Sequence, residues 1–232
     1  AWSSANPDHL PVMVMIEIKT QSVPEAAAAE GTELAIDLPW TVPLPTTPEL
    51  LDALDAEVTS VFPSDGLITP DDVRGGAPTL EAAVLERGWP TIDDSRGKVL
   101  VALNNTGAIR ELYSDGRPSL EGRPMFTSAE PGDPDAAFVR FDDPSSEGIA
   151  DAVRAGYLIR TRTDSPTADA RADDTTDRDL AFASGAHYLS TDYYEPSAYF
   201  DSPYVVAFAD GAIARCNPIT APPSCSPDRL VE

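Results

Sequence analysis

Short runs of apolar residues recur along the chain, and their spacing predicts β-strands. The first run covers residues 11–19 (PVMVMIEIK), where apolar side chains occupy both faces up to the charged Glu17 and Lys19. A run that is apolar on both faces is typical of a parallel strand covered on both sides. Similar or shorter runs predict further strands at 98–103, 125–127, 137–141, 157–161 and 187–191, with a final strand or extension at 204–208.

Helix-start signals lie between these runs. Thr47, Thr69 and Thr79 can each cap a helix, and the first two are followed by proline, which favours the first helical turn. We expect helices that start at these residues, the first reaching about 60 and the third about 88, and two more over 149–155 and 168–183. Strands that alternate with helices in this way predict an α/β fold with a parallel sheet.

The composition fits a folded, strongly acidic protein. The chain has 232 residues, of which 42% are hydrophobic, enough for the core of one domain. Its 16 Lys and Arg against 39 Asp and Glu give a net charge of -23. This charge disfavours nucleic acid and anionic membranes as partners, so membrane contact is expected to be transient at most. It says nothing about neutral lipid. No apolar run approaches the length of a membrane span.

Polar residues follow the predicted strands at the point where each strand ends. Parallel α/β folds place their chemistry at the carboxyl ends of the strands, which meet at one edge of the sheet. The residues at these ends are Glu17, Lys19, Asn104, Asn105, Arg160, Arg162, Asp192 and Tyr193. The alternative at any single position is a residue that only solvates the rim or forms an ion pair.

The chemistry of these residues indicates metal-assisted cleavage of a phosphodiester. Glu17 and Asp192, with an amide oxygen, could hold Ca²⁺, which takes oxygen ligands. Lys19 and Arg162 could hold a phosphate and stabilise the charge that develops on it during transfer, so we assign them the catalytic role. The remaining residues are assigned to substrate binding: Asn104, Arg160 and Tyr193.

Histidine and cysteine are scarce. The two histidines, His9 and His187, lie away from the carboxyl ends of the predicted strands, so a histidine acid and base pair is hard to build from this chain. Cys216 and Cys225 are nine positions apart in a Pro-rich tail, a spacing that allows a local disulfide. A disulfide is favoured over two free thiols and points to an exported protein.

Several segments resemble, in order, the calcium-dependent phosphoinositide-specific phospholipases C of bacteria and fungi. They are DHLPVMVMIEIK (8–19), TPDDVRG (69–75), GWPTIDDSRGKVLVALN (88–104), GYLIRTRTD (156–164), SGAHYLSTDYY (184–194) and RCNPITAPPSC (215–225). The resemblance implies a secreted TIM-barrel enzyme that cleaves phosphatidylinositol to diacylglycerol and a cyclic inositol phosphate. It also implies Ca²⁺ at the barrel mouth, with Glu17 as a metal ligand and Lys19 in contact with the phosphate.

Compared with this family, the chain begins at what resembles the fourth strand. We therefore expect one domain over residues 1–232, a partial (β/α)8 barrel that lacks roughly the first three β/α units. Residues 209–232 would be its disulfide-closed tail. The missing N-terminal part would carry the histidines that act as general base and acid, so the chain alone is expected to be inactive. A truncated sequence or a piece of a longer protein is favoured over a degenerate copy.

Two other functions stay open. One is a glycerophosphodiester phosphodiesterase acting on soluble diesters, because the Pro-rich residues 21–48 could reshape the mouth. The other is a non-catalytic secreted module that keeps the fold and binds calcium or a surface glycan.

Overall fold

Six parallel strands form the centre of the protein. The computed structural model describes residues 2–29, 31, 33–34, 38–164, 167–208 and 211–230. One sheet has the order β1-β2-β3 and the other β4-β5-β6, and all four ladders are parallel. The strands are β1 (Val12–Ile16), β2 (Val99–Leu103), β3 (Met125–Thr127), β4 (Phe138–Arg140), β5 (Leu158–Arg162) and β6 (Tyr188–Ser190). The predicted α/β fold with parallel strands is confirmed.

The two sheets meet between β3 and β4. A parallel bridge joins Ser128, just after β3, to Phe138 at the start of β4. Neighbouring strands therefore follow the order of the sequence from β1 to β6, which leaves these two strands at the edges. The edges approach each other at their amino ends, where the Tyr188 hydroxyl donates to the Pro11 carbonyl oxygen at 3.4 Å.

Burial differs sharply between the first two strands. Every residue of β2 is buried, because β2 pairs with β1 on one side and with β3 on the other. Every residue of β1 is only half-buried, since its one described ladder is with β2. Side chains from both faces of β1 pack against the apolar core, as predicted, but they are only partly buried, and β1 is an edge strand among the described residues.

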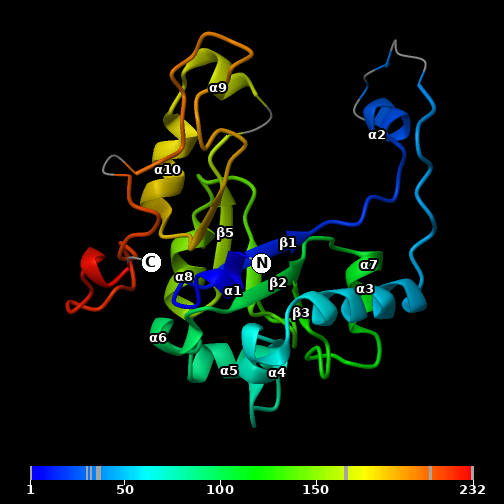
Figure 1. The fold of residues 1–232 in the computed structure, drawn as a ribbon, viewed down its shortest axis with the longest axis vertical. Helices are drawn as coiled ribbons and strands as arrows, with labels where there is room; N and C mark the ends of the chain where they lie inside the picture. The colour runs from blue at the N-terminus through cyan, green and yellow to red at the C-terminus, as the bar shows by residue number, and fades with distance from the viewer. Residues whose placement is uncertain are drawn as a thin grey trace.

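Most of the helices lie around these strands, whereas α2 (Val23–Ala29) and α9 (Ala168–Ala172) lie away from them (Figure 1). The other helices are α1 (Trp2–Ala5), α3 (Pro48–Val61), α4 (Pro70–Arg74), α5 (Leu80–Glu86), α6 (Ile92–Ser95), α7 (Ala108–Ser114), α8 (Gly148–Ala155) and α10 (Thr176–Ser184), with 3-10 turns at Ser64–Gly66 and Pro227–Arg229. The predicted caps are confirmed: the hydroxyls of Thr47, Thr69 and Thr79 accept backbone N–H bonds in the first turns of α3, α4 and α5. No helix among the described residues is long and apolar enough to cross a membrane.

Three predictions of local structure differ from the structure. Residues 168–183 form two helices, α9 and α10, because Asp173 adopts a left-handed conformation with φ of 52° and ends the first of them. The helices α1, α2, α6 and α7 were not predicted. Residues 204–208 form no ladder in the described chain, and a backbone bond from Val206 to the Tyr193 carbonyl holds them in place.

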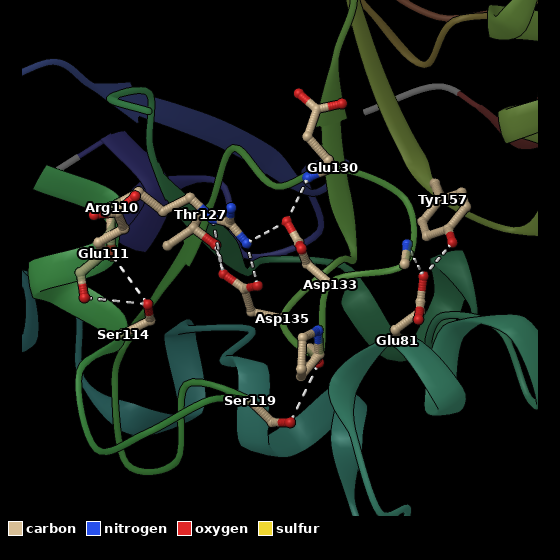
Figure 2. Close-up of polar contacts among 12 residues, drawn as sticks. Glu81, Arg110, Glu111, Ser114, Ser119, Thr127, Glu130, Asp133, Asp135 and Tyr157 are labelled. Carbon is tan, nitrogen blue, oxygen red and sulfur yellow. Dashed lines mark hydrogen bonds and ion pairs between the residues drawn. The ribbon is translucent and has the colours of Figure 1, made fainter. Parts of the chain in front are cut away.

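One apolar cluster includes residues of both sheets. Two arginines next to it form ion pairs, the buried Arg123 and the half-buried Arg110. Arg123 donates to Asp52 and Asp55, and so ties α3 to the segment before β3. Arg110 of α7 donates to Asp135, which also accepts the Thr127 hydroxyl at 2.6 Å (Figure 2). This second group links α7, the end of β3 and the connection that leads to β4.

The tail carries the predicted disulfide, since Cys216 and Cys225 are bonded. The Asn217 side chain fixes the tail to the body by donating to the Gly185 carbonyl at 2.7 Å. Four residues of the predicted tail, 209–210 and 231–232, lie outside the described residues. The single domain over residues 1–232 stays a prediction.

Candidate functional site

Polar side chains at the ends of β1 and β2 contact one another. The parallel ladder pairs Ile16 with Leu103, so the residues that follow each strand leave the sheet side by side. Glu17 forms an ion pair with Lys19 and accepts a hydrogen bond from the Asn104 side-chain amide at 3.1 Å. The structure therefore brings together three of the predicted site residues.

Arg140 extends this group to the second sheet. It ends β4 and donates to the side-chain oxygen of Asn104 at 3.0 Å and to the backbone oxygen of the same residue at 3.1 Å. Sequence reasoning missed this residue, although it lies at the end of a predicted strand, the same signal that selected Glu17 and Arg160. One strand-end contact thus connects the two sheets at the predicted mouth.

Asp142 gathers three arginines around one carboxylate. Its oxygens lie 2.6 Å from Arg160, 3.4 Å from Arg140 and 3.5 Å from Arg162. The ladder explains this grouping, because it pairs Arg140 with Arg160 across β4 and β5. The buried Arg160 also donates to the Ser190 hydroxyl at 2.6 Å, which continues the network to β6. Asp142 was missed because it reads as part of a turn in the sequence DDP.

We call this connected set the strand-end network: Glu17, Lys19, Asn104, Arg140, Asp142, Arg160, Arg162 and Ser190. Its four cations outnumber its two carboxylates, so it carries a positive charge of two within a chain whose net charge is -23. A positive cluster raises the local concentration of anions beside it.

The pKa values in the network reflect this charge. The hydrogen bond from Lys19 is the main reason that the pKa of Glu17 is lowered; burial opposes it, while Asn104 and the charge of Arg140 add to it. The pKa of Arg160 is lowered, first by burial and then by the charges of Arg162 and Arg140, whereas Asp142 acts in the opposite direction. A bound anion would relieve the repulsion among these guanidinium groups.

Asp192 and Tyr193 lie in a different group. The backbone N–H of Asp192 is 3.5 Å from an oxygen of the buried Asp164, whose other oxygen accepts the hydroxyls of Thr163 and Thr191 at 2.7 and 2.6 Å. Tyr193 is buried in a small aromatic cluster, edge-on to a second tyrosine. No described contact joins Asp192 to Glu17, so their roles as shared metal ligands stay a prediction.

The described residues do not by themselves form a calcium site. Ca²⁺ takes six to eight oxygen ligands, and no group of three His, Cys, Asp or Glu residues in the described chain is arranged to hold a metal. The Glu17 carboxylate is already paired with Lys19, and the side-chain oxygen of Asn104 accepts from Arg140. No reaction step is therefore assigned to a metal on this chain.

Both histidines lie away from the network. His9 is buried before β1, where its ring contacts the Ser3 hydroxyl at 2.7 Å and the Leu10 carbonyl at 2.6 Å. His187 precedes β6 and accepts the backbone N–H of Ile159 at 3.0 Å. Each ring is therefore bonded at the amino end of a strand, opposite the edge where the network lies.

Comparison with known proteins identifies the chain's relatives. The family model "Phosphoinositide phospholipase C, Ca2+-dependent" matches residues 1–218. A Ca²⁺-dependent phosphatidylinositol-specific phospholipase C from Streptomyces antibioticus shares 22% identity at a TM-score of 0.54, over 84% of this chain and 68% of that one.

A calcium-dependent phosphoinositol-specific phospholipase C from a Gram-negative Pseudomonas species, in its myoinositol complex, shares 20% identity at a TM-score of 0.48, over 69% of this chain and 54% of that one. This chain therefore spans about two thirds of the first structure and about half of the second. At 22% identity, the Streptomyces structure establishes a common fold. No curated protein matches the sequence. Because the family model extends over residues 1–218, the chain belongs to the Ca²⁺-dependent phosphoinositide phospholipases C.

Proposed function

We propose that this chain forms the phosphate-binding side of an active site that cleaves phosphatidylinositol to diacylglycerol and a cyclic inositol phosphate. The observation that carries the proposal is the strand-end network, which gathers four cations at the carboxyl ends of parallel strands. A phosphodiester is an anion, and more negative charge builds up on its free oxygens as the bond to the leaving group breaks. Fixed guanidinium groups suit that change.

The two more accessible cations fit the catalytic role. Lys19 is exposed and Arg162 is half-buried, so either can reach a phosphate oxygen from the rim. Arg160 is buried and held by Asp142 and Ser190, which suits a residue that orients the site. Lys19 and Arg162 would hold the phosphate and stabilise the charge that forms on it, and Arg160 would bind substrate.

The remaining assignments of the site are part of the same proposal. Asn104, bonded to both Glu17 and Arg140, would position these two side chains and bind substrate. Glu17 would supply one oxygen ligand for the Ca²⁺ on which the family depends, with other ligands from outside the strand-end network. Asp192 would supply a second oxygen ligand for the metal, and Tyr193 would bind substrate.

We infer that additional β/α units close these strands into a TIM barrel. β1 and β6 are edge strands, and β1 presents a half-buried apolar surface of the kind that normally pairs or is covered. The Streptomyces fold supports the inference, since this chain spans 68% of it. The added units would supply the general acid and base, which neither histidine of this chain can provide at the network. The Cys216–Cys225 disulfide supports secretion.

A substrate panel tests this function. A longer protein that carries the proposed units together with this chain should release cyclic inositol phosphate from phosphatidylinositol only when Ca²⁺ is present. Cleavage of glycerophosphoinositol without cleavage of phosphatidylinositol would favour the glycerophosphodiesterase alternative. No cleavage of any inositol phosphodiester would overturn the proposal and leave a non-catalytic binding module.

A further inference from the structure

Asp142 is the carboxylate at the centre of the strand-end network. It lies two residues after Arg140, the last residue of β4, at the carboxyl end of that strand. Its Oδ1 lies 2.6 Å from Nη1 of Arg160 and 3.5 Å from Nε of Arg162. Its Oδ2 lies 3.4 Å from Nε of Arg140. Both carboxylate oxygens are therefore in use, and three cations from two neighbouring strands share one anion.

The strands by themselves would leave these three arginines in mutual repulsion. The ladder pairs Arg140 with Arg160, and Arg162 follows two residues further along β5, so that like charges lie side by side. Burial lowers the pKa of Arg160 and the charges of the other two arginines act in the same direction, whereas Asp142 opposes them. A carboxylate between the guanidinium groups offsets the repulsion and keeps them together.

Arg160 in turn holds the Asp142 carboxylate in place. The Arg160 side chain is 8% exposed and donates to Asp142 and to the Ser190 hydroxyl, each at 2.6 Å. A charge-assisted bond to a guanidinium that is fixed on two sides leaves the carboxylate little freedom to turn. Arg162, whose side chain is 40% exposed, is thereby held beside a fixed anion and keeps part of its surface open to a ligand.

The next residue along the chain has a different set of contacts. Asp143 accepts the backbone N–H of Ser145 at 2.8 Å and its hydroxyl at 2.6 Å, so it closes the turn that follows β4. The two adjacent aspartates thus have separate places, one in the turn and one among the arginines. They form a matched pair of equal charge for a test of what Asp142 does.

We propose that Asp142 is a positioning residue, which holds the three arginines of the network in the arrangement that receives the phosphate and does not itself contact the substrate. This proposal rests on the proposed function, because that function assigns the network to phosphate binding. Negative charge develops on the phosphate oxygens in the transition state, and guanidinium groups that are already oriented stabilise it without reorganising. Asp142 therefore acts on the reaction through the arginines.

Phosphate binding by the 232-residue chain tests the sign of the effect. Inorganic phosphate should shift the NMR signal of the Arg162 Nε–H group, and the titration gives a dissociation constant. The loss of a negative charge alone would tighten anion binding, yet Asp142→Asn should weaken it by about three-fold or more, because the arginines turn apart. The matched control Asp143→Asn removes the same charge and should not weaken binding. Asp142→Glu keeps the charge but displaces it, and should bind phosphate with an affinity between those of the parent and Asp142→Asn.

Kinetics of the longer protein test whether Asp142 acts through Arg162. Asp142→Asn should lower kcat for phosphatidylinositol cleavage by roughly ten-fold, with a smaller change in KM, whereas Asp143→Asn should leave both unchanged. In the Arg162→Gln background, Asp142→Asn should cost less than about three-fold, because one of the arginines that it positions is gone. A residue that only stabilises the fold would lower activity equally in both backgrounds.

Three results would overturn the inference. Tighter phosphate binding by Asp142→Asn would make the carboxylate a competitor of the phosphate, and equal losses in both Arg162 backgrounds would make its role structural. The third is no phosphate-induced shift in the parent chain. If Asp142→Asn fails to fold, Asp142→Glu decides the binding test, and binding as tight as that of the parent counts against positioning. A longer protein that cleaves no phosphatidylinositol contradicts the proposed function, whereas the phosphate titration still decides the role of Asp142.

Discussion

Replacement of Asp135 by alanine should destabilise the chain more than any single change on its surface. The Asp135 side chain is 3% exposed and accepts bonds from Arg110 and from the fully buried Thr127 (Figure 2). Its removal leaves the Thr127 hydroxyl without an acceptor at about 1–3 kcal/mol and breaks a charge-assisted pair worth about 1.5–3 kcal/mol. Arg110 keeps its contact with Asp133 at 2.8 Å, which limits the total to about 3–4 kcal/mol.

A neighbouring aspartate offers a matched control for this change. Asp133 contacts the same Arg110 nitrogen, but its side chain is 38% exposed and solvent screens the pair. Asp133→Ala should therefore cost less than about 1 kcal/mol. Burial acts to lower the pKa of Arg110, but the hydrogen bond with Asp135 and the charges of both aspartates outweigh it and raise that pKa in the parent chain.

Urea titration followed by circular dichroism measures both free energies of unfolding. A double-mutant cycle with Thr127→Val separates the hydroxyl from the ion pair, because valine removes the donor that Asp135→Ala leaves unsatisfied. The double variant should be less destabilised than the sum of the single variants by about 1 kcal/mol. The reasoning fails if Asp135→Ala costs less than about 1 kcal/mol, or no more than Asp133→Ala.

Three further changes test the fold. Gly97→Ala would place the new Cβ 2.2 Å from the Pro7 backbone oxygen at φ of 72°, and urea titration should show a loss of stability of about 3 kcal/mol. The control Gly88→Ala has a similar φ of 74° but open space around the Cβ, and should lose about 1–2 kcal/mol. Equal losses of stability would contradict the clash. Burial raises the pKa of Asp55 above 3.8, so the folded state disfavours the ionised carboxylate. The stability of the parent chain, measured relative to Asp55→Asn, should therefore rise as the pH falls through the raised pKa toward 3.8. A fall in relative stability over this range would contradict the assignment. Replacing Cys216 and Cys225 by serine should lower the stability of the chain by about 2–3 kcal/mol. An unchanged melting temperature would show that the tail folds independently of the disulfide.

Local signals predicted most of the framework. Threonine followed by proline or a helical stretch identified the starts of α3, α4 and α5, because the capping hydroxyl acts within a few residues of itself. Buried apolar runs located the strands, because the burial pattern of a strand is also visible within a few neighbouring residues. The break at Asp173 escaped prediction, since a left-handed aspartate has no strong sequence signal.

The site was predictable where it depends on adjacent strands. Glu17 and Asn104 follow β1 and β2, and the parallel ladder between these strands brings them into contact. Asp142 was missed because its role depends on three arginines that come together only when β4 and β5 pair. Asp192 was grouped with Glu17 because both follow parallel strands; it follows β6, at the other edge of the described strand order, so a shared metal site stays a prediction.

The most direct test of the central claim is the kinetics of the strand-end network on phosphatidylinositol. In a longer protein carrying the proposed units, Arg162→Gln should lower kcat/KM for Ca²⁺-dependent formation of cyclic inositol phosphate by roughly 100-fold or more, because a developing charge loses its partner. Arg154→Gln, on the exposed face of α8, serves as the matched control and should leave the rate unchanged. Equal activity of the two variants would contradict the assignment of the network to phosphate binding.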